Sequence, residues 1–218
     1  RRHGMESHTL QINTSSTSLE NARVIYECCQ AQEKKVVLLG HSKGGVDSSV
    51  AITIYPDLRD IVVGLITIQS PIGGCPVAQD FAQDPTIAVL FNFTLKNATV
   101  GDPLCLQQLT YTFRRSFLEE YPWRQGEVPT VCFASHSGGR LSIMAGFHKF
   151  LQSRYGAKSD GLVCPVDAFL PGSIAVEVGG VDHGASVIAT TPMCRFNQGY
   201  LIETLICLLL APPADSSS

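Results

Sequence analysis

The ten residues Val36–Gly45, VVLLGHSKGG, constrain the fold of this chain more than any other stretch. The four apolar residues that open it predict a strand buried on both faces of a sheet. The next residues fit the pattern G-x-S-x-G around Ser42, and the segment up to Ile54 suits a helix. A strand that turns directly into a helix leaves no room for side chains beside the turn, and the residue at its tip is strained. The sequence therefore predicts a sharp turn that presents the Ser42 hydroxyl above a sheet edge.

Strand-like and helix-like segments alternate along most of the chain. Besides the strand before Ser42, the predicted strands are Thr9–Asn13, Ile61–Ile68, Val128–Ala134 and Ser173–Val178. The first predicted helix begins at the possible capping box Thr17/Glu20 and ends near Gln32, and the second follows Ser42 and ends near Ile54. Two more are predicted from Arg140 to Tyr155 and from Phe196 to Leu210. Because strands and helices alternate, we predict an α/β fold with a mostly parallel sheet and right-handed crossovers.

Residues 77–127 interrupt this alternation. They carry helical fragments at Pro85–Phe93 and Leu104–Tyr121 and the only tryptophan, Trp123. An insertion between two strands at the sheet edge that holds Ser42 suggests a cap or lid, and the alternative is a helical subdomain that only completes the fold. We expect residues 1–218 to form a single domain with a disordered tail at 212–218.

Composition excludes several classes of protein. The 218 residues are 44% hydrophobic and carry a formal net charge of −3, so a sizeable core is expected and a basic face for nucleic acid is not. The longest apolar run, Leu205–Ala211, is too short to span a bilayer, so no integral membrane segment is predicted. The eight cysteines lack C-x-x-C spacing, which argues against a zinc site and a redox pair.

The sequence leaves the compartment and the oligomeric state open. Glycosylation sequons begin at Asn13, Asn92 and Asn97, and they would matter only in a secreted protein. No signal segment opens the chain, which gives a slight preference for the cytoplasm or an organelle. Because the chain begins at Arg1 without an initiator methionine, we expect an upstream portion to be missing.

The chemistry of Ser42 depends on its partners. The simplest alternative is a serine that only caps the following helix. A nucleophilic serine needs a base to take its proton and an acid to hold that base in the right tautomer. Of six histidines, His183 is the preferred base because it lies in a glycine-rich loop after the last predicted strand, and His136 is second. The other four are less suitable: His3 and His8 precede the sheet, His41 lies inside the Ser42 turn, and His148 lies in mid-helix.

For the acid, Asp160 in the turn Ser-Asp-Gly-Leu-Val is preferred over its rivals Asp167 and Asp182. We expect the Asp160 turn to be exposed. Asp182 adjoins His183 in sequence and so does not easily reach the imidazole nitrogen. The chain order Ser42, Asp160, His183 is the order typical of α/β-hydrolases.

These motifs resemble a known family. GHSKGG, TIQSPIGG, VCFASHSGG, SDGLV and VDHGASV, spread from about Leu10 to Val187, are similar to segments of lipase-type α/β-hydrolases. The similarity is to bacterial triacylglycerol lipases and, more closely, to plant and algal lipase-like hydrolases. It implies an α/β-hydrolase fold with Ser42 as nucleophile, Asp160 as acid and His183 as base. The chemistry of such a triad requires no metal or organic cofactor. Some bacterial lipases carry a structural calcium, and nothing in this sequence identifies ligands for it.

The resemblance has two departures. The lipase loop T-P-H-x-G is Ser70-Pro71-Ile72-Gly73 here, without its histidine. The backbone N–H of Lys43 is the expected oxyanion donor, but the second donor of this fold comes from an H-G segment after an earlier strand, and His3-Gly4 lies too close to Leu10 to be that segment. We therefore expect the N-terminal strands of the fold to be missing.

Three functions are compatible with the sequence. The preferred one is a serine hydrolase of carboxylic esters, with a hydrophobic ester or lipid as substrate and an acyl-enzyme intermediate. The alternative is a catalytically weak or inactive protein of the hydrolase fold that binds a hydrophobic ligand or partner. A peptidase of the same fold is the third.

Overall fold

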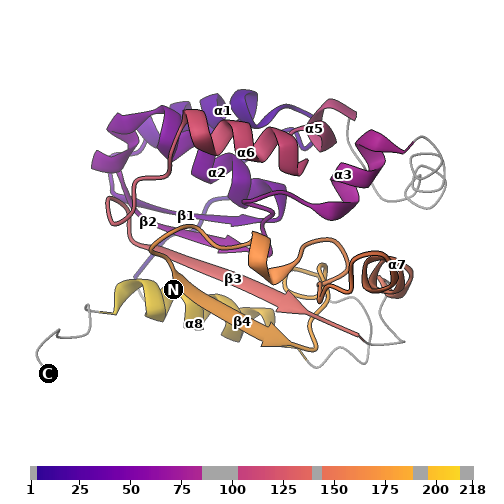
Figure 1. Ribbon diagram of the computed structural model, residues 1–218. Helices are drawn as coiled ribbons and strands as arrows, with labels where there is room; N and C mark the ends of the chain where they lie inside the picture. Colours follow the sequence, from indigo (N-terminus) through magenta and orange to yellow (C-terminus); the bar gives the residue numbers. More distant parts are fainter. Residues whose placement is uncertain (1–3, 85–102, 139–143, 189–195, 212–218) are drawn as a thin grey trace, which may run out of the picture.

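Within the part of the chain that the structure describes, a parallel sheet of four strands forms the centre of the molecule (Figure 1). The computed structural model describes residues 4–84, 103–138, 144–188 and 196–211. The strands lie in chain order, and they are β1 (Val36–His41), β2 (Val62–Ile68), β3 (Thr130–His136) and β4 (Ile174–Gly179). Because all four run the same way, the loops that follow them meet at one edge of the sheet. The predicted α/β fold is confirmed, and each of these strands overlaps a predicted one.

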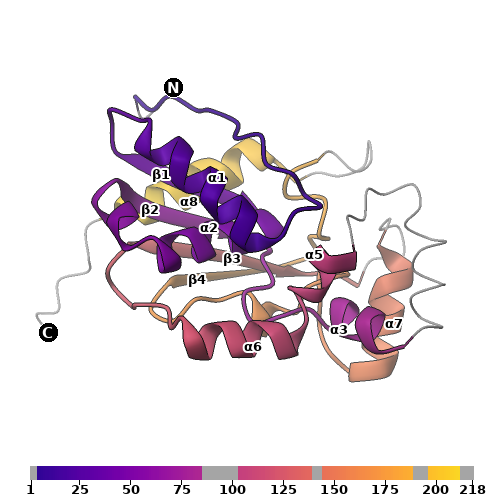
Figure 2. The same ribbon diagram turned by 90° about the horizontal axis from the view of Figure 1, so that it is seen from above.

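Helices cover both faces of the sheet. The helices α1 (Ser18–Gln30) and α2 (Lys43–Ile54) lie on one face and α8 (Gln198–Leu210) on the other (Figures 1 and 2). The capping box predicted for α1 is present, with Thr17 and Glu20 bonded to each other's backbone N–H groups. On the α8 face, a side chain on Gly64 of β2 would overlap Leu209, so the glycine allows α8 to pack closely on the sheet.

Among the described residues, three short helices follow β2: α3 (Pro76–Gln83), α5 (Pro103–Gln107) and α6 (Tyr111–Glu120). The single helical fragment predicted over Leu104–Tyr121 is two helices, because Thr110 caps a new helix through the N–H of Phe113. Phe117 of α6 is buried in the same cluster as α1 and α2, so α6 is part of the layer that covers the sheet (Figure 2). The predicted fragment Pro85–Phe93 and the tail 212–218 lie outside the described residues, and the cap over 77–127 stays a prediction.

The last elements surround the carboxyl end of the sheet. The helix α7 (Ala145–Tyr155) and the short 3-10 helix η2 (Pro165–Asp167) connect β3 to β4. In both views α3 and α7 lie next to each other, beyond the carboxyl ends of the strands (Figures 1 and 2). Their contact includes a hydrogen bond of 2.5 Å from the Tyr155 hydroxyl to Asp80. The two helices thus adjoin the edge at which Ser42 lies.

Two predictions about the N-terminal part were wrong. Residues Thr9–Asn13 form no strand; Leu10 and Ile12 pack against the main core, so the alternating pattern there reflects core contacts and not pairing. The strand β1 is not buried on both faces, and Leu39 is 43% exposed. The reason is that β1 is the outer strand of the described sheet and α8 packs on β2 and β3, so the α8 face of β1 is only partly covered.

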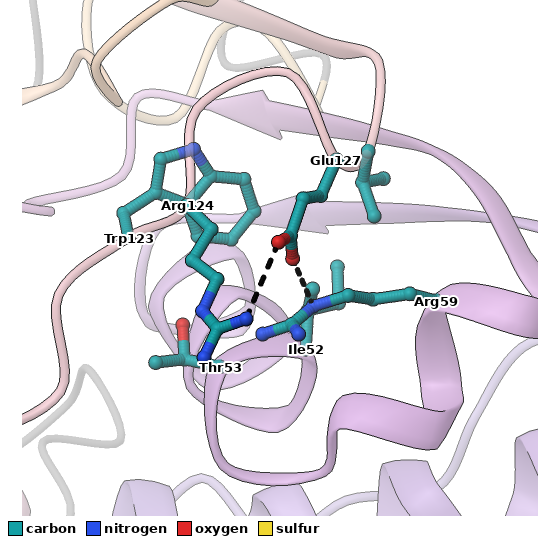
Figure 3. A pocket seen from close by; sticks show the side chains of 7 residues that line it. Ile52, Thr53, Arg59, Trp123, Arg124 and Glu127 are labelled. Carbon is teal, nitrogen blue, oxygen red and sulfur yellow. Dashed lines mark hydrogen bonds and ion pairs between the residues drawn. The ribbon is translucent and has the colours of Figure 1, made fainter.

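The opposite, amino-terminal edge of the sheet carries a hollow between the 3-10 helix η1 (Pro56–Asp60), Trp123 and the chain before β3 (Figure 3). Glu127 bridges two arginines there, with its oxygens 2.8 Å from Arg59 Nε and 3.4 Å from Arg124 Nη1. These ion pairs line the hollow and join η1 to the chain before β3. The cluster is therefore a structural contact, and it lies at the edge of the sheet away from Ser42.

None of the described helices is long and apolar enough to cross a membrane.

Candidate active site

Ser42 lies at a turn without any intervening loop. It follows the last residue of β1 and precedes the first residue of α2, and its backbone has φ 53° and ψ −126°. Its N–H donates to the carbonyl oxygen of Ile68 over 2.8 Å, which attaches the turn to the end of β2. A serine at positive φ is strained, and such strain persists only where the surroundings impose it.

The glycines around Ser42 have different roles. A side chain on Gly40 would overlap the backbone of Gly44 and Gly45, and a side chain on Gly45 would overlap Ser70. A side chain on Gly44 would meet nothing within 4 Å. The crowded positions are therefore Gly40 and Gly45, although Gly44 is the second glycine of the G-x-S-x-G pattern.

His183 reaches Ser42 from a loop beyond β4. Its Nε2 lies 2.9 Å from Ser42 Oγ, across 141 residues of sequence. Three hydrogen bonds hold the loop backbone. The N–H of His183 donates to the carbonyl oxygen of Asp160, and the N–H groups of Gly184 and Ala185 donate to the carboxylate of Asp182. The Asp182 carboxylate is thus engaged in its own loop.

Asp160 completes a chain of hydrogen bonds. Its Oδ2 lies 2.9 Å from His183 Nδ1, while Oδ1 accepts the N–H groups of Leu162 at 3.0 Å and Val163 at 2.8 Å. The expectation of an exposed turn was wrong, because only 1% of Asp160 is exposed. Its charge is compatible with burial because two backbone donors and the imidazole satisfy its oxygens.

The tautomer of His183 follows from this geometry. A carboxylate only accepts hydrogen bonds, so Nδ1 carries the proton and donates it to Asp160. Nε2 is then free to accept the proton of the Ser42 hydroxyl. The arrangement can transfer a proton from a serine to a buried imidazole, which is the first requirement of nucleophilic catalysis.

The rival candidates lie elsewhere. Asp167 accepts the Tyr111 hydroxyl at 2.7 Å, and burial raises the pKa of its carboxyl. His136 ends β3 with Glu177 3.7 Å away. His148 is buried in α7, where burial lowers the pKa of its imidazole. None of these groups is bonded to Ser42 or to His183.

His41 has a contact that the sequence did not predict. Its Nε2 lies 2.8 Å from the carbonyl oxygen of His183, and because a carbonyl only accepts, this nitrogen carries a proton. Burial and the neighbouring His183 lower the pKa of His41 to about 4. His41 is therefore neutral near pH 7 and supports the loop that carries His183. Its place next to Ser42 was the only sequence signal for this role.

Lys43 follows Ser42 as the first residue of α2. Its backbone N–H belongs to the helix end, where such groups have no partner within the helix. Its ammonium group is directed to Asp47, one turn further along α2, with both carboxylate oxygens within 3.0 Å. Asn21 of α1 donates to the same carboxylate at 2.7 Å, so this buried cluster joins α1 to α2 behind the Ser42 turn.

Among the residues that the structure describes, no group of three or more His, Cys, Asp and Glu side chains is arranged to hold a metal ion.

Comparison with solved structures identifies the fold. The mature lipase BlEst2 of Bacillus licheniformis superposes with a TM-score of 0.71 at 22% identity, over 91% of this chain and 77% of that one. The metagenomic carboxyl esterase MGS0156 gives a TM-score of 0.74 at 22% identity, over 92% of this chain and 64% of that one. This chain has a lipase-like α/β-hydrolase fold. The lipase of Staphylococcus hyicus has the same fold at greater distance, with a TM-score of 0.58 and 12% identity over 80% of this chain and 70% of that one.

Sequence comparison agrees with the α/β-hydrolase fold. The family model described as the PGAP1-like alpha/beta domain matches residues 4–100, which include Ser42. A search of curated protein sequences gives no match. The resemblance to bacterial lipases that was drawn from the motifs is thus confirmed for the fold.

Proposed function

We propose that this protein hydrolyses carboxylic esters, with Ser42 as nucleophile, His183 as general base and acid, and Asp160 as the group that orients His183. The observation that carries the proposal is the continuous chain of two 2.9 Å contacts from Ser42 Oγ through His183 to Asp160. The strained backbone of Ser42 and the names of the structural neighbours, lipases and a carboxyl esterase, agree with it.

The reaction has two halves. Ser42 Oγ attacks the ester carbonyl while its proton passes to His183 Nε2, and the imidazolium is stabilised by Asp160. The backbone N–H of Lys43, at the start of α2, donates a hydrogen bond to the tetrahedral oxyanion. The C–O bond to the alcohol breaks, the alcohol leaves with the proton from Nε2, and an acyl group remains on Ser42. Water then attacks the acyl-enzyme with His183 again as base, which releases the acid and restores Ser42.

The substrate class that fits best is a hydrophobic ester. Val187 and Ile188, which directly follow the His183 loop, are 41% and 64% exposed. Apolar side chains near a hydrolytic site suit an acyl chain better than a small polar ester. If the segment 77–127 is a cap, hydrolysis of long-chain esters should rise at a lipid–water interface.

The test compares purified wild-type protein with two alanine variants on p-nitrophenyl esters of increasing acyl length. We expect Ser42→Ala to abolish hydrolysis. Ser137→Ala changes another serine at the carboxyl edge, just after β3, and should keep the wild-type rate. Hydrolysis that survives in Ser42→Ala would refute the assignment.

The alternative function, binding of a hydrophobic ligand with little or no turnover, is favoured by one observation. The strand that leads into Ser42 is the outer strand of the described sheet, and the sequence motifs identify one oxyanion donor, Lys43, without the H-G segment that supplies the second donor in this fold. Loss of one donor typically lowers kcat about 10²–10³-fold. A wild-type protein that binds long-chain esters and leaves them intact would establish this alternative.

A further inference from the structure

Gln69 directly follows β2 and is the centre of a buried hydrogen-bond network. It is fully buried, and its φ of 50° makes it one of two non-glycine residues with positive φ in the described part of the chain. The other is Ser42, and the two are neighbours: Ser42 N–H donates to the carbonyl oxygen of Ile68, the residue before Gln69. Backbone strain at a residue with a long polar side chain needs a structural cause.

The side-chain amide of Gln69 bonds to the loop that carries His183. Its Nε2 donates to the backbone oxygen of Asp182 at 3.0 Å, and its Oε1 accepts the hydroxyl of Ser186. These two partners lie on either side of His183 in the sequence. The amide therefore holds the loop at both ends of the segment that positions the imidazole.

Ser135 at the end of β3 adds a third connection. It accepts the other Nε2 proton of Gln69 at 2.5 Å and donates its own to the carbonyl oxygen of Val181 at 2.9 Å. Both donors of the amide are thus used, and each hydroxyl in the network has a partner. A network that is complete in this way rigidifies the groups that it joins.

We infer that Gln69 is a positioning residue for His183: its amide fixes the 181–186 loop so that Nε2 stays within reach of Ser42 Oγ and Nδ1 within reach of Asp160. The expected effect of Gln69 on kcat rests on the proposed function. Its effect on the position of the His183 loop rests on the geometry alone. Gln69 touches neither Ser42 Oγ nor the imidazole through these bonds. It acts through the loop backbone.

The test uses Gln69→Met, which keeps a side chain of similar length and removes all three hydrogen bonds. Because a displacement of about 1 Å at a reacting group can cost about 100-fold in rate, we expect kcat to fall by roughly that factor with KM little changed. The second readout is the downfield proton resonance of His183 Nδ1–H, which reports the bond to Asp160 without any turnover. We expect it to broaden or disappear in Gln69→Met.

The matched control is Ile66→Val, a small change at a buried position of β2, the strand that precedes Gln69. Ile66 lies in the core on the α8 face. It should lower stability slightly and keep both kcat and the resonance. Ser186→Ala removes one of the three bonds and should show a smaller loss of kcat than Gln69→Met. This variant also tests the inference if Gln69→Met does not fold.

The outcomes separate the two proposals. Gln69→Met, or Ser186→Ala in its place, with wild-type kcat and an unchanged resonance would overturn the positioning role. If the wild-type protein has no esterase activity but its resonance is present and is lost in Gln69→Met, the proposed function fails and the positioning role stands. If kcat falls only in proportion to the folded fraction, Gln69 is merely structural and the inference is wrong.

Discussion

Replacing Asp160 with asparagine gives a prediction whose size follows from the geometry. In the variant, the N–H groups of Leu162 and Val163 still require an acceptor at the Oδ1 position, so the amide oxygen stays there. The NH₂ group then faces His183 Nδ1. Because NH₂ only donates, Nδ1 must accept, and the single imidazole proton moves to Nε2, where it points at the Ser42 hydroxyl.

A base in this tautomer cannot take the serine proton. The equivalent tautomer error in a serine protease lowers kcat about 10⁴-fold, which corresponds to about 5.4 kcal/mol in the activation barrier. We expect a loss of this order for Asp160→Asn, with the fold intact. The assay is steady-state hydrolysis of p-nitrophenyl butyrate, with circular dichroism to confirm folding.

The matched control is Asp167→Asn. Asp167 is the rival acid in the sequence, and its carboxylate accepts the Tyr111 hydroxyl. This variant should keep a rate close to that of the wild type. An Asp160→Asn protein that keeps more than a tenth of the wild-type kcat, or an Asp167→Asn protein that loses as much, would refute the reasoning.

Three further predictions concern stability, each measured by urea unfolding. Burial and His183 lower the pKa of His41 from 6.5 to about 4 in the folded protein. As the pH falls, the unfolded state therefore binds this proton before the folded state does. The free energy of unfolding should then decrease between pH 6.5 and pH 4, by up to about 1.4 kcal/mol per pH unit. Subtracting the pH profile of the unfolding free energy of His41→Gln from that of the wild type isolates this loss. A difference that does not change with pH would contradict the prediction. Thr17→Ala removes the cap of α1 and should cost about 1 kcal/mol, while no change would mean that the cap is not formed in solution. Asp47→Ala leaves the Lys43 ammonium, whose side chain is 13% exposed, without its partner and should cost about 3–5 kcal/mol. Lys43→Met combined with Asp47→Leu should recover most of this loss, and a double variant as unstable as Asp47→Ala would contradict the explanation.

The strands and the main catalytic candidates could be predicted because their signals are local. Apolar runs identified β2 and β3, and the short segment between β1 and α2 showed where a serine could be presented. Since loops after parallel strands meet at one edge, it followed that Ser42 and His183 could meet although they lie 141 residues apart. The structure places their side chains within hydrogen-bond distance, and their chemical roles stay proposals.

The errors arose where burial depends on distant partners. Asp160 looked exposed because a carboxylate in a glycine turn usually is, and the sequence does not show the imidazole and the two N–H groups that satisfy it. Thr9–Asn13 alternates like a strand, but alternation over five residues does not supply a neighbouring strand to pair with. Gln69 was missed for the same reason, because the partners that join its amide to β3 and to the His183 loop, Ser135, Asp182 and Ser186, lie at least 66 positions away.

The central claim, that Ser42 is a nucleophile activated by His183, is tested most directly by covalent labelling. A fluorophosphonate reacts with an activated serine hydroxyl and needs no knowledge of the natural substrate. The labelled protein is digested, and mass spectrometry locates the adduct. The account predicts one adduct, on Ser42, that forms much more slowly in Asp160→Asn and is absent in Ser42→Ala. An adduct on another serine, or a folded wild-type protein that remains unlabelled, would contradict it.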